Sequence, residues 1–184
     1  MEMPAEAALL VIDVQQGMED PSWGPRNNLD MEANTSRLIV EWQRTGRPII
    51  LVRHDSTKTD SPLRPELPGN AFKPIVSGDP DLLVTKSVNS AFYGDPDLHA
   101  WLQAREIDTV VVCGIQTNMC CETTARMAGN LGYATYFVLD ATHTFDLVGP
   151  DGVTISADEL ARVTAANLHG EFATVVATDD LVAG

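Results

Sequence analysis

Short runs of apolar, mostly β-branched residues alternate along this chain with longer segments of helical periodicity. Six runs have the length and composition of strands, and their ranges are Ala8–Val14, Pro48–Val52, Leu82–Thr85, Thr109–Gly114, Thr135–Leu139 and Ala173–Ala177. Because these runs are almost continuously apolar, they are typical of parallel strands covered on both faces. The alternation therefore predicts a three-layer α/β/α, Rossmann-like fold with a six-stranded, mainly parallel sheet.

Four helices are expected between the strands. They are Met31–Thr45, a segment that opens at Asp95-Pro96, a segment from about Asn118 to Gly132, and a segment that begins at Ser156–Glu159. Gly46 is suited to end the first helix, and Pro96 is suited to the first position of the second. Ser156 followed by Glu159 has the spacing of a capping box.

The chain has no repeat, low-complexity segment or linker, so we expect a single domain over residues 1–184. Its longest irregular stretch, Arg53–Asp81, contains five prolines. Long loops in compact domains usually have a function. This loop is therefore expected to cover a site.

The charge of the chain limits its partners. It has 12 Lys and Arg against 26 Asp and Glu, a formal net charge of −14, which disfavours binding to nucleic acid or to an anionic membrane. Its opening residues read as a buried strand rather than a signal peptide. Three cysteines, two of them adjacent, make a poor disulfide framework. We therefore expect a cytoplasmic protein.

Polar residues stand where several of the expected strands end, and ligands bind beyond the carboxyl ends of strands in sheets of this type. Asp13 ends the first apolar run, Lys86 ends the third, and Gly114–Thr117 ends the fourth. A partly desolvated carboxylate at Asp13 is a usable base, although it can instead cap a turn. Lys86 alone reads as a solvated strand-end lysine, and it becomes a candidate only as the partner of Asp13.

The adjacent cysteines Cys120 and Cys121 lie at the start of the third expected helix. With Thr117 or Asn118 as N-cap, Cys120 falls in the first turn, where the helix dipole lowers the pKa of a thiol. Successive helical residues point about 100° apart, so only one sulfur is expected to face the strand ends.

Other uses of the cysteines have less support. Adjacent thiols lack the spacing of zinc ligands, and the four histidines form no HxH or HExxH pattern. A disulfide between neighbouring residues would be strained. Cys113, inside a strand, is expected to be a packing residue.

Three motifs occur in a fixed order along the chain. They are Asp13-Val14-Gln15, Lys86 followed by Ser90-Ala91-Phe92, and the Gly-x-x-Thr-x-x-Cys-x-x-Thr pattern of Gly114–Thr123. Together they resemble the isochorismatase-like cysteine hydrolase family, which includes nicotinamidases, N-carbamoylsarcosine amidases, ureidoacrylate amidohydrolases and isochorismatases. The resemblance extends from about Ala8 to Ala177.

This resemblance implies a catalytic triad of Asp13, Lys86 and Cys120, with Cys121 at a position that is commonly valine. It also implies a cis peptide at Ile115–Gln116 and an oxyanion hole formed by the N–H groups of Gln116 and Cys120. The implied reaction is hydrolysis of a C–N bond in a small amide, ureido compound or lactam through a thioester.

The resemblance also bears on metals and on the substrate. Metal-dependent nicotinamidases carry Asp-x-His where this chain has Val52-Arg53-His54, so neither a metal nor another cofactor is expected. The residues expected to contact the substrate are Gln15, His54, Asn89, Phe92, Tyr93 and His143. Phe92 is the foremost of these, because the family's Ser-Ala-Phe segment lines the site. His54 and His143 can alternatively hold loops in place.

Two other functions stay open from the sequence. One is isochorismatase-type cleavage of a vinyl ether, which needs no cysteine. The other is noncatalytic binding on the same fold. By resemblance, the partner is a small-molecule substrate and the assembly is a homodimer or homotetramer.

Overall fold

A parallel six-stranded sheet forms the centre of the protein in the computed structural model, which describes residues 3–182. Its strands are β1 (Ala8–Ile12), β2 (Ile49–His54), β3 (Leu82–Lys86), β4 (Thr109–Ile115), β5 (Ala134–His143) and β8 (Thr174–Val176). Their order is β3-β2-β1-β4-β5-β8, and every neighbouring pair is parallel. The predicted fold class is therefore confirmed.

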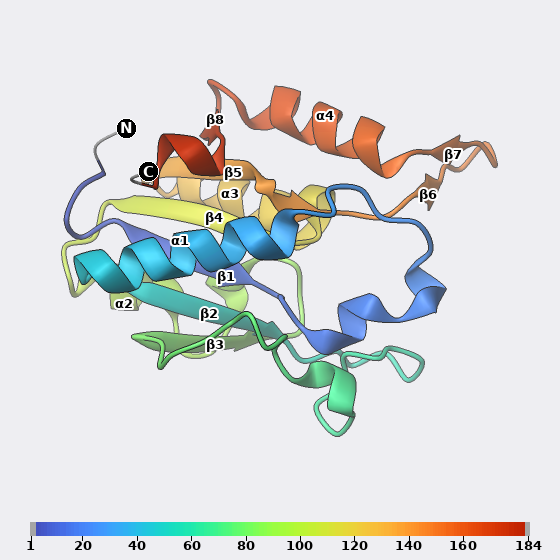
Figure 1. The fold of residues 1–184 in the computed structure, drawn as a ribbon, viewed down its shortest axis with the longest axis horizontal. Coiled ribbons are helices and arrows are strands. Elements are labelled where there is room, and N and C mark those ends of the chain that lie inside the picture. The colour runs from blue at the N-terminus through green and yellow to red at the C-terminus, as the bar shows by residue number, and fades with distance from the viewer. Residues whose placement is uncertain (1–2, 183–184) are drawn as a thin grey trace.

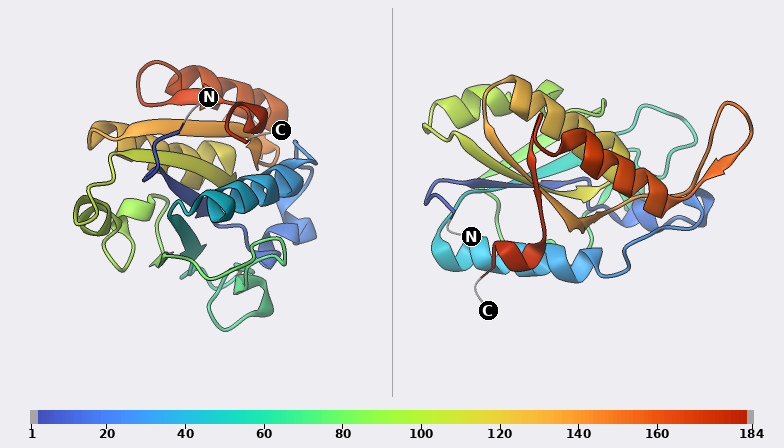
Figure 2. Two further views of the ribbon diagram at one scale, coloured as in Figure 1. Left: turned by 60° about the vertical axis from the view of Figure 1, so that its left-hand side comes forward. Right: turned by 90° about the horizontal axis from the view of Figure 1, so that it is seen from above.

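Helices cover both faces of this sheet (Figures 1 and 2). They are α1 (Met31–Thr45), α2 (Leu98–Gln103), α3 (Glu122–Asn130) and α4 (Ala157–Leu168). In β1, Leu9 packs in the core that contains α1 residues, whereas Leu10 packs in the core that contains residues of the other three helices. Alternate side chains of one strand are thus buried on opposite faces, which explains the unbroken apolar runs.

The second helix begins later than the sequence suggested. It starts at Leu98, with the Asp97 side chain accepting a hydrogen bond from the Ala100 N–H at 3.0 Å. The backbone of Asp95 is instead paired with Thr85 of β3 through two 2.9 Å hydrogen bonds, and the Asp95–Pro96 peptide is cis. The expectation that Pro96 opens the helix is therefore wrong.

The helix that carries the cysteines begins with a π-helical turn, Thr117–Cys121, and continues as α3. Neither predicted N-cap acts as one. The Thr117 hydroxyl donates to Thr142 Oγ1 at 2.9 Å, and Asn118 Oδ1 accepts from the Thr144 hydroxyl. Both side chains tie the turn to the end of β5 and the residue after it rather than cap the helix. Single π-turns are rare and occur often at functional sites.

The carboxyl-terminal part of the fold also differs from expectation. β5 continues to His143, past the predicted end at Leu139, and its pairing with β4 shifts register between Val112 and Gly114. A two-stranded hairpin of β6 (Leu147–Val148) and β7 (Thr154–Ile155) was not predicted. The expected cap at Ser156 is present, since its hydroxyl accepts from the Glu159 N–H at 3.2 Å. Within residues 3–182, no helix is long and apolar enough to cross a membrane.

The strand order places a topological switch point between β1 and β4. From β1 the chain proceeds through β2 to β3 at one edge, and from β4 through β5 to β8 at the other. Gly114 has a φ of 121°, and a Cβ atom there would overlap the backbone of Ile12. Glycine thus allows β4 to lie against the end of β1, where ligand sites of doubly wound folds occur.

Candidate active site

Asp13 follows the last residue of β1 and is fully buried. Its φ of 52° is left-handed, an uncommon backbone conformation for a residue other than glycine, and its N–H donates to Val52 O at 2.9 Å. The carboxylate oxygen Oδ2 accepts a 2.6 Å hydrogen bond from Lys86 Nζ. Among residues 3–182, the other oxygen, Oδ1, has no hydrogen-bond partner. A carboxylate held in this way has one oxygen left to accept a proton.

Lys86 is the last residue of β3, and the parallel register pairs it with His54 of β2. Its ammonium contacts three groups, Asp13 Oδ2 at 2.6 Å, His54 Nδ1 at 3.1 Å and Cys120 Sγ at 3.3 Å. Burial alone would lower the pKa of Lys86, but the charges of Asp13 and Cys120 outweigh burial and raise it above its usual value. The lysine is therefore a fixed cation in the centre of the site.

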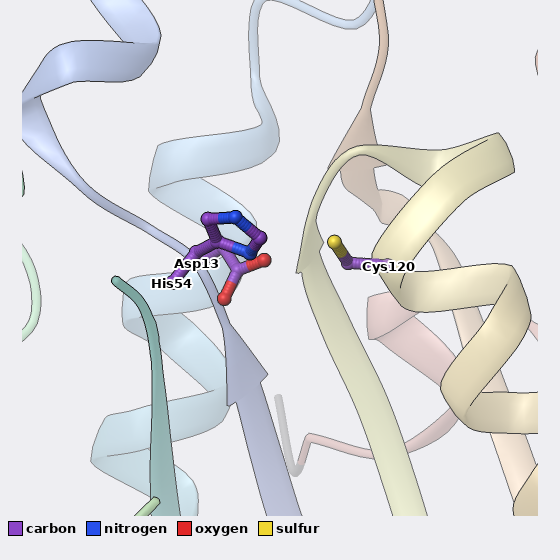
Figure 3. A group of neighbouring side chains, drawn as sticks. All are labelled: Asp13, His54 and Cys120. Carbon is purple, nitrogen blue, oxygen red and sulfur yellow. The ribbon is translucent and has the colours of Figure 1, made fainter. Parts of the chain in front are cut away.

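Cys120 reaches this centre from the π-helical turn, and its sulfur points toward Asp13 and His54 (Figure 3). The sulfur, a carboxylate oxygen of Asp13 and a ring nitrogen of His54 all lie within 4.8 Å of one another. Two strand ends and one helical turn thus bring together all three members of the predicted triad, and the end of β2 adds His54.

The protonation of Cys120 differs from the expectation for a helix terminus. Burial raises the pKa of the thiol well above its usual value, and the neighbouring Asp13 carboxylate raises it further. The nearby ammonium of Lys86 offsets these effects only in part. Burial beside a carboxylate therefore opposes the predicted lowering of this pKa. A resting thiol needs a base, and Asp13 is beside it.

His54 contacts the triad directly, whereas the sequence placed it only at the rim of the pocket. Burial, together with the charge of Lys86, lowers the pKa of its imidazole, so the ring is neutral. An ammonium can only donate, and Nδ1 must therefore accept its hydrogen bond and Nε2 carry the proton. His54 thus fixes the orientation of Lys86.

The chain between β4 and Cys120 forms another wall of the site. The Ile115–Gln116 peptide is cis, as the resemblance implied, and Gln116 and Cys120 both line the pocket. Cys121 is fully buried in the core beside α3, and Cys113 donates to Leu10 O inside the sheet. Of the three sulfurs, that of Cys120 faces the pocket.

The pocket above the triad has a volume of about 260 Å³. It is lined by Asp13, Met18, Trp23, His54, Lys58, Leu63, Asn89, Gln116, Met119, Cys120, Phe145 and Leu147. Trp23 and Phe145 stack on each other with ring centroids 5.5 Å apart. Lys58 and Leu63 come from the proline-rich loop, which was expected to cover a site. The apolar lining residues have no sequence signal beyond their position after strands β1, β2, β4 and β5.

Two residues that were expected to bind substrate are fully buried and do not line the pocket. Gln15 is fully buried, and its amide donates to His54 O and Asn70 O and accepts from the His54 N–H. It therefore joins the ends of β1 and β2. His143 is also fully buried, as the last residue of β5 rather than a loop residue, and it packs edge-on against Phe145.

The segment after Lys86 also lies differently from expectation. Phe92 stacks on Tyr133 with ring centroids 5.9 Å apart, and the Tyr93 side chain is 71% exposed. Neither lines the pocket above Cys120, whereas Asn89 does. Ser90 explains this turn, because its hydroxyl accepts from the Phe92 N–H and directs the chain back toward α3.

The stability of this region is expected to depend on pH through His143. Burial and the charge of Arg26 lower its pKa to about 3, against about 6.5 in an unfolded chain. The unfolded state therefore binds more protons between these pH values, and stability is lost as pH falls below about 6.5. The free energy of unfolding is measured in urea between pH 7 and 5 and plotted against pH. His143→Leu should reduce the slope of this plot by up to about 1.4 kcal/mol per pH unit. An unchanged slope would contradict a buried, neutral His143.

Comparisons with known proteins identify the family of this chain. A family model for the isochorismatase domain matches residues 7–180. YrdC of Bacillus subtilis, an uncharacterized isochorismatase family protein, is 39% identical over 181 residues, which cover 98% of this chain and 96% of YrdC. The chain belongs to the isochorismatase family.

Structures within the isochorismatase family show how closely the fold is shared. A putative hydrolase of this family from Chromobacterium violaceum is 41% identical, with a TM-score of 0.92 over 98% of this chain and 93% of that one. Nicotinamidase 3 of Arabidopsis thaliana is 31% identical over 195 residues, covering 95% of this chain and 86% of the relative. The family thus contains relatives that hydrolyse amides.

Proposed function

We propose that this isochorismatase-family chain is a metal-independent cysteine hydrolase that cleaves a C–N bond of a small amide, ureido compound or lactam. The observation that carries this proposal is the contact of one buried ammonium, Lys86 Nζ, with both Asp13 and Cys120 at the floor of a pocket. Nucleophilic catalysis by a thiol needs an adjacent base and a group that stabilises charge. These three side chains meet both requirements.

In the first half of the proposed reaction, Asp13 takes the proton from the Cys120 thiol and the thiolate attacks the carbonyl carbon. Lys86 stabilises the thiolate as it forms. The N–H groups of Gln116 and Cys120 would hold the developing oxyanion, in the way that backbone donors do in other acyl-transfer sites. The tetrahedral intermediate then expels the amine, which receives the proton held by Asp13.

The second half regenerates the thiol. A water molecule gives a proton to Asp13 and attacks the thioester carbon, and the intermediate expels the Cys120 thiolate. The thiolate then recovers the proton from Asp13, and the carboxylic acid leaves. Asp13 thus acts as base and then as acid in each half of the reaction, which suits a carboxylate with one unpaired oxygen in a buried site.

The pocket supports a substrate with a small apolar body. Met18, Leu63, Met119 and Leu147 line its walls together with the stacked rings of Trp23 and Phe145. A volume of about 260 Å³ admits a compact molecule rather than a peptide or polymer. Apolar burial would supply the binding free energy, while the strand-end residues hold the scissile carbonyl.

Lys58 is expected to favour substrates with an anionic end. It is exposed and lines the pocket, and within residues 3–182 its ammonium has no carboxylate within ion-pair distance. Lys58→Met should raise KM for amides that bear a carboxylate by about tenfold with little change in kcat, since an exposed charge contributes binding rather than chemistry. Arg162→Met on α4 removes the same charge from an exposed side chain outside this pocket and should leave KM unchanged.

The proposed activity is tested with a panel of small amides, ureido compounds and lactams, assayed for release of ammonia or amine. Rapid quenching with a substrate that turns over should add one acyl group to Cys120, detectable by peptide mass spectrometry. Turnover without any Cys120 adduct in a single-turnover experiment, together with an acyl group on another residue, would overturn the proposed mechanism.

A further inference from the structure

The ammonium of Lys86 occupies the centre of a set of metal-ligand side chains. Its three neighbours are a carboxylate oxygen of Asp13, Nδ1 of His54 and the sulfur of Cys120, at 2.6, 3.1 and 3.3 Å. The same three residues are the group of acidic, histidine and cysteine side chains whose donor atoms converge within 4.8 Å. One oxygen, one nitrogen and one sulfur are a donor set that suits Zn²⁺.

We propose that Asp13, His54 and Cys120 form a latent site for a soft divalent cation such as Zn²⁺, which the Lys86 ammonium fills in place of the metal. All three donors line the pocket, so a metal held by them would have an open fourth position toward solvent or substrate. A metal bound there would block the proposed reaction, because a metal-bound thiolate is not free to attack. Lys86 therefore keeps the site free of metal as well as stabilising charge.

The charges of the groups explain why the ammonium excludes a metal. In the wild-type site the Asp13 carboxylate balances the charge of Lys86 in a buried ion pair of 2.6 Å. A divalent cation held by these donors would lie within a few ångströms of the Lys86 ammonium, which would repel it. Without the ammonium, Asp13 and a Cys120 thiolate together balance the two charges of Zn²⁺. The thiol proton is released to solvent, so metal affinity rises with pH.

The geometry requires only a modest closure around the metal. Tetrahedral Zn²⁺ has ligands at about 2.0–2.3 Å, which places them roughly 3.5 Å from one another. The present donors lie within 4.8 Å while a lysine side chain separates them. Shortening that side chain to alanine removes the obstruction and leaves the three donors on their own strand ends and helical turn.

The test is a Co²⁺ titration of the metal-free Lys86→Ala protein, followed by displacement with Zn²⁺. Cobalt bound to a thiolate gives a charge-transfer absorption in the near ultraviolet, which does not depend on turnover. The variant should bind Co²⁺ at least about 100-fold more tightly than wild type, because a buried like charge has been removed. Adding Cys120→Ser should abolish the absorption, and adding His54→Ala should weaken binding about tenfold. Adding Cys121→Ala instead removes the neighbouring sulfur and should leave the cobalt absorption intact.

Stability provides a second measurement if Lys86→Ala folds poorly without metal. Zn²⁺ that binds only the folded state should raise the Tm of Lys86→Ala progressively, with the logarithm of its concentration above Kd, and leave the wild-type Tm unchanged. Equal metal affinity of the variant and wild type would overturn the proposal. So would metal binding that survives the loss of Cys120. Neither result depends on the substrate or on the proposed hydrolase activity.

Discussion

Replacing Cys120 with serine should lower kcat/KM by about 10⁴-fold or more, the scale seen when a catalytic nucleophile is removed. Serine keeps the size of the side chain but has a much higher pKa, and a site with one carboxylate base is poorly suited to deprotonate it. The sulfur at this position lies 3.3 Å from Lys86 Nζ, and the pocket opens above it. Steady-state assays on a substrate found by the amide panel measure the effect.

The matched control for this prediction is the next residue. Cys121 is fully buried in the core beside α3, away from the pocket lining, so Cys121→Ala should keep most of the activity and lose some stability. If instead Cys121→Ala were inactive and Cys120→Ser active, Cys121 would be the nucleophile. If the two cysteines instead formed a regulatory disulfide, oxidation would reduce the mass of the wild-type protein by two hydrogens. Neither variant would show this change.

Replacing Asp13 with asparagine should reduce both activity and stability. The change removes the proposed general base and acid, a kind of group that typically contributes about 10²–10⁴-fold in rate. It also leaves the Lys86 ammonium buried without its counter-ion, at a cost of about 3–5 kcal/mol of unfolding free energy. Asparagine tolerates the left-handed backbone at this position, so the effect reports on charge rather than on strain. Urea unfolding and turnover are measured on the same samples.

A double variant separates the two effects. Asp13→Asn combined with Lys86→Met removes both charges and keeps the unbranched stem of the lysine. Most of the lost stability should return, because a buried ion pair replaced by neutral groups is often nearly neutral for folding. Activity should not return, since the base and the cation are both absent. A double variant as unstable as Asp13→Asn would mean that the ion pair is not the source of the loss.

Most of the sheet could be predicted from the sequence, because strands buried on both faces leave unbroken apolar runs. The same principle placed Asp13 and Lys86 at strand ends, and parallel strands bring such ends to one edge. The extension of β5 to His143 escaped prediction because polar residues interrupt its second half, where the register with β4 shifts. The start of α2 was misplaced because Asp95 pairs across space with Thr85, a contact that local propensity does not encode.

The candidate site could also be predicted only in part from the sequence. The triad positions follow from strand ends and a motif, but the charge state of Cys120 depends on burial, which only the packed structure reveals. Gln15 and His143 illustrate the limit of reading polar residues as ligands. The hydrogen bonds of Gln15 are satisfied by backbone groups of β2 and of the proline-rich loop, and His143 is enclosed at the end of a strand.

The separation between the proposed reacting groups and the pocket walls has a consequence for how such a protein diversifies. Asp13, Lys86 and Cys120 come from the ends of packed elements, whereas Trp23, Lys58 and the other wall residues come mainly from long connections between them. Loops accept substitutions and insertions that a packed sheet does not. New substrates can therefore be acquired by exchanging connections, while the reaction is inherited unchanged. Grafting the 16–23 and 58–63 segments between two relatives would transfer preference without rebuilding the chemistry.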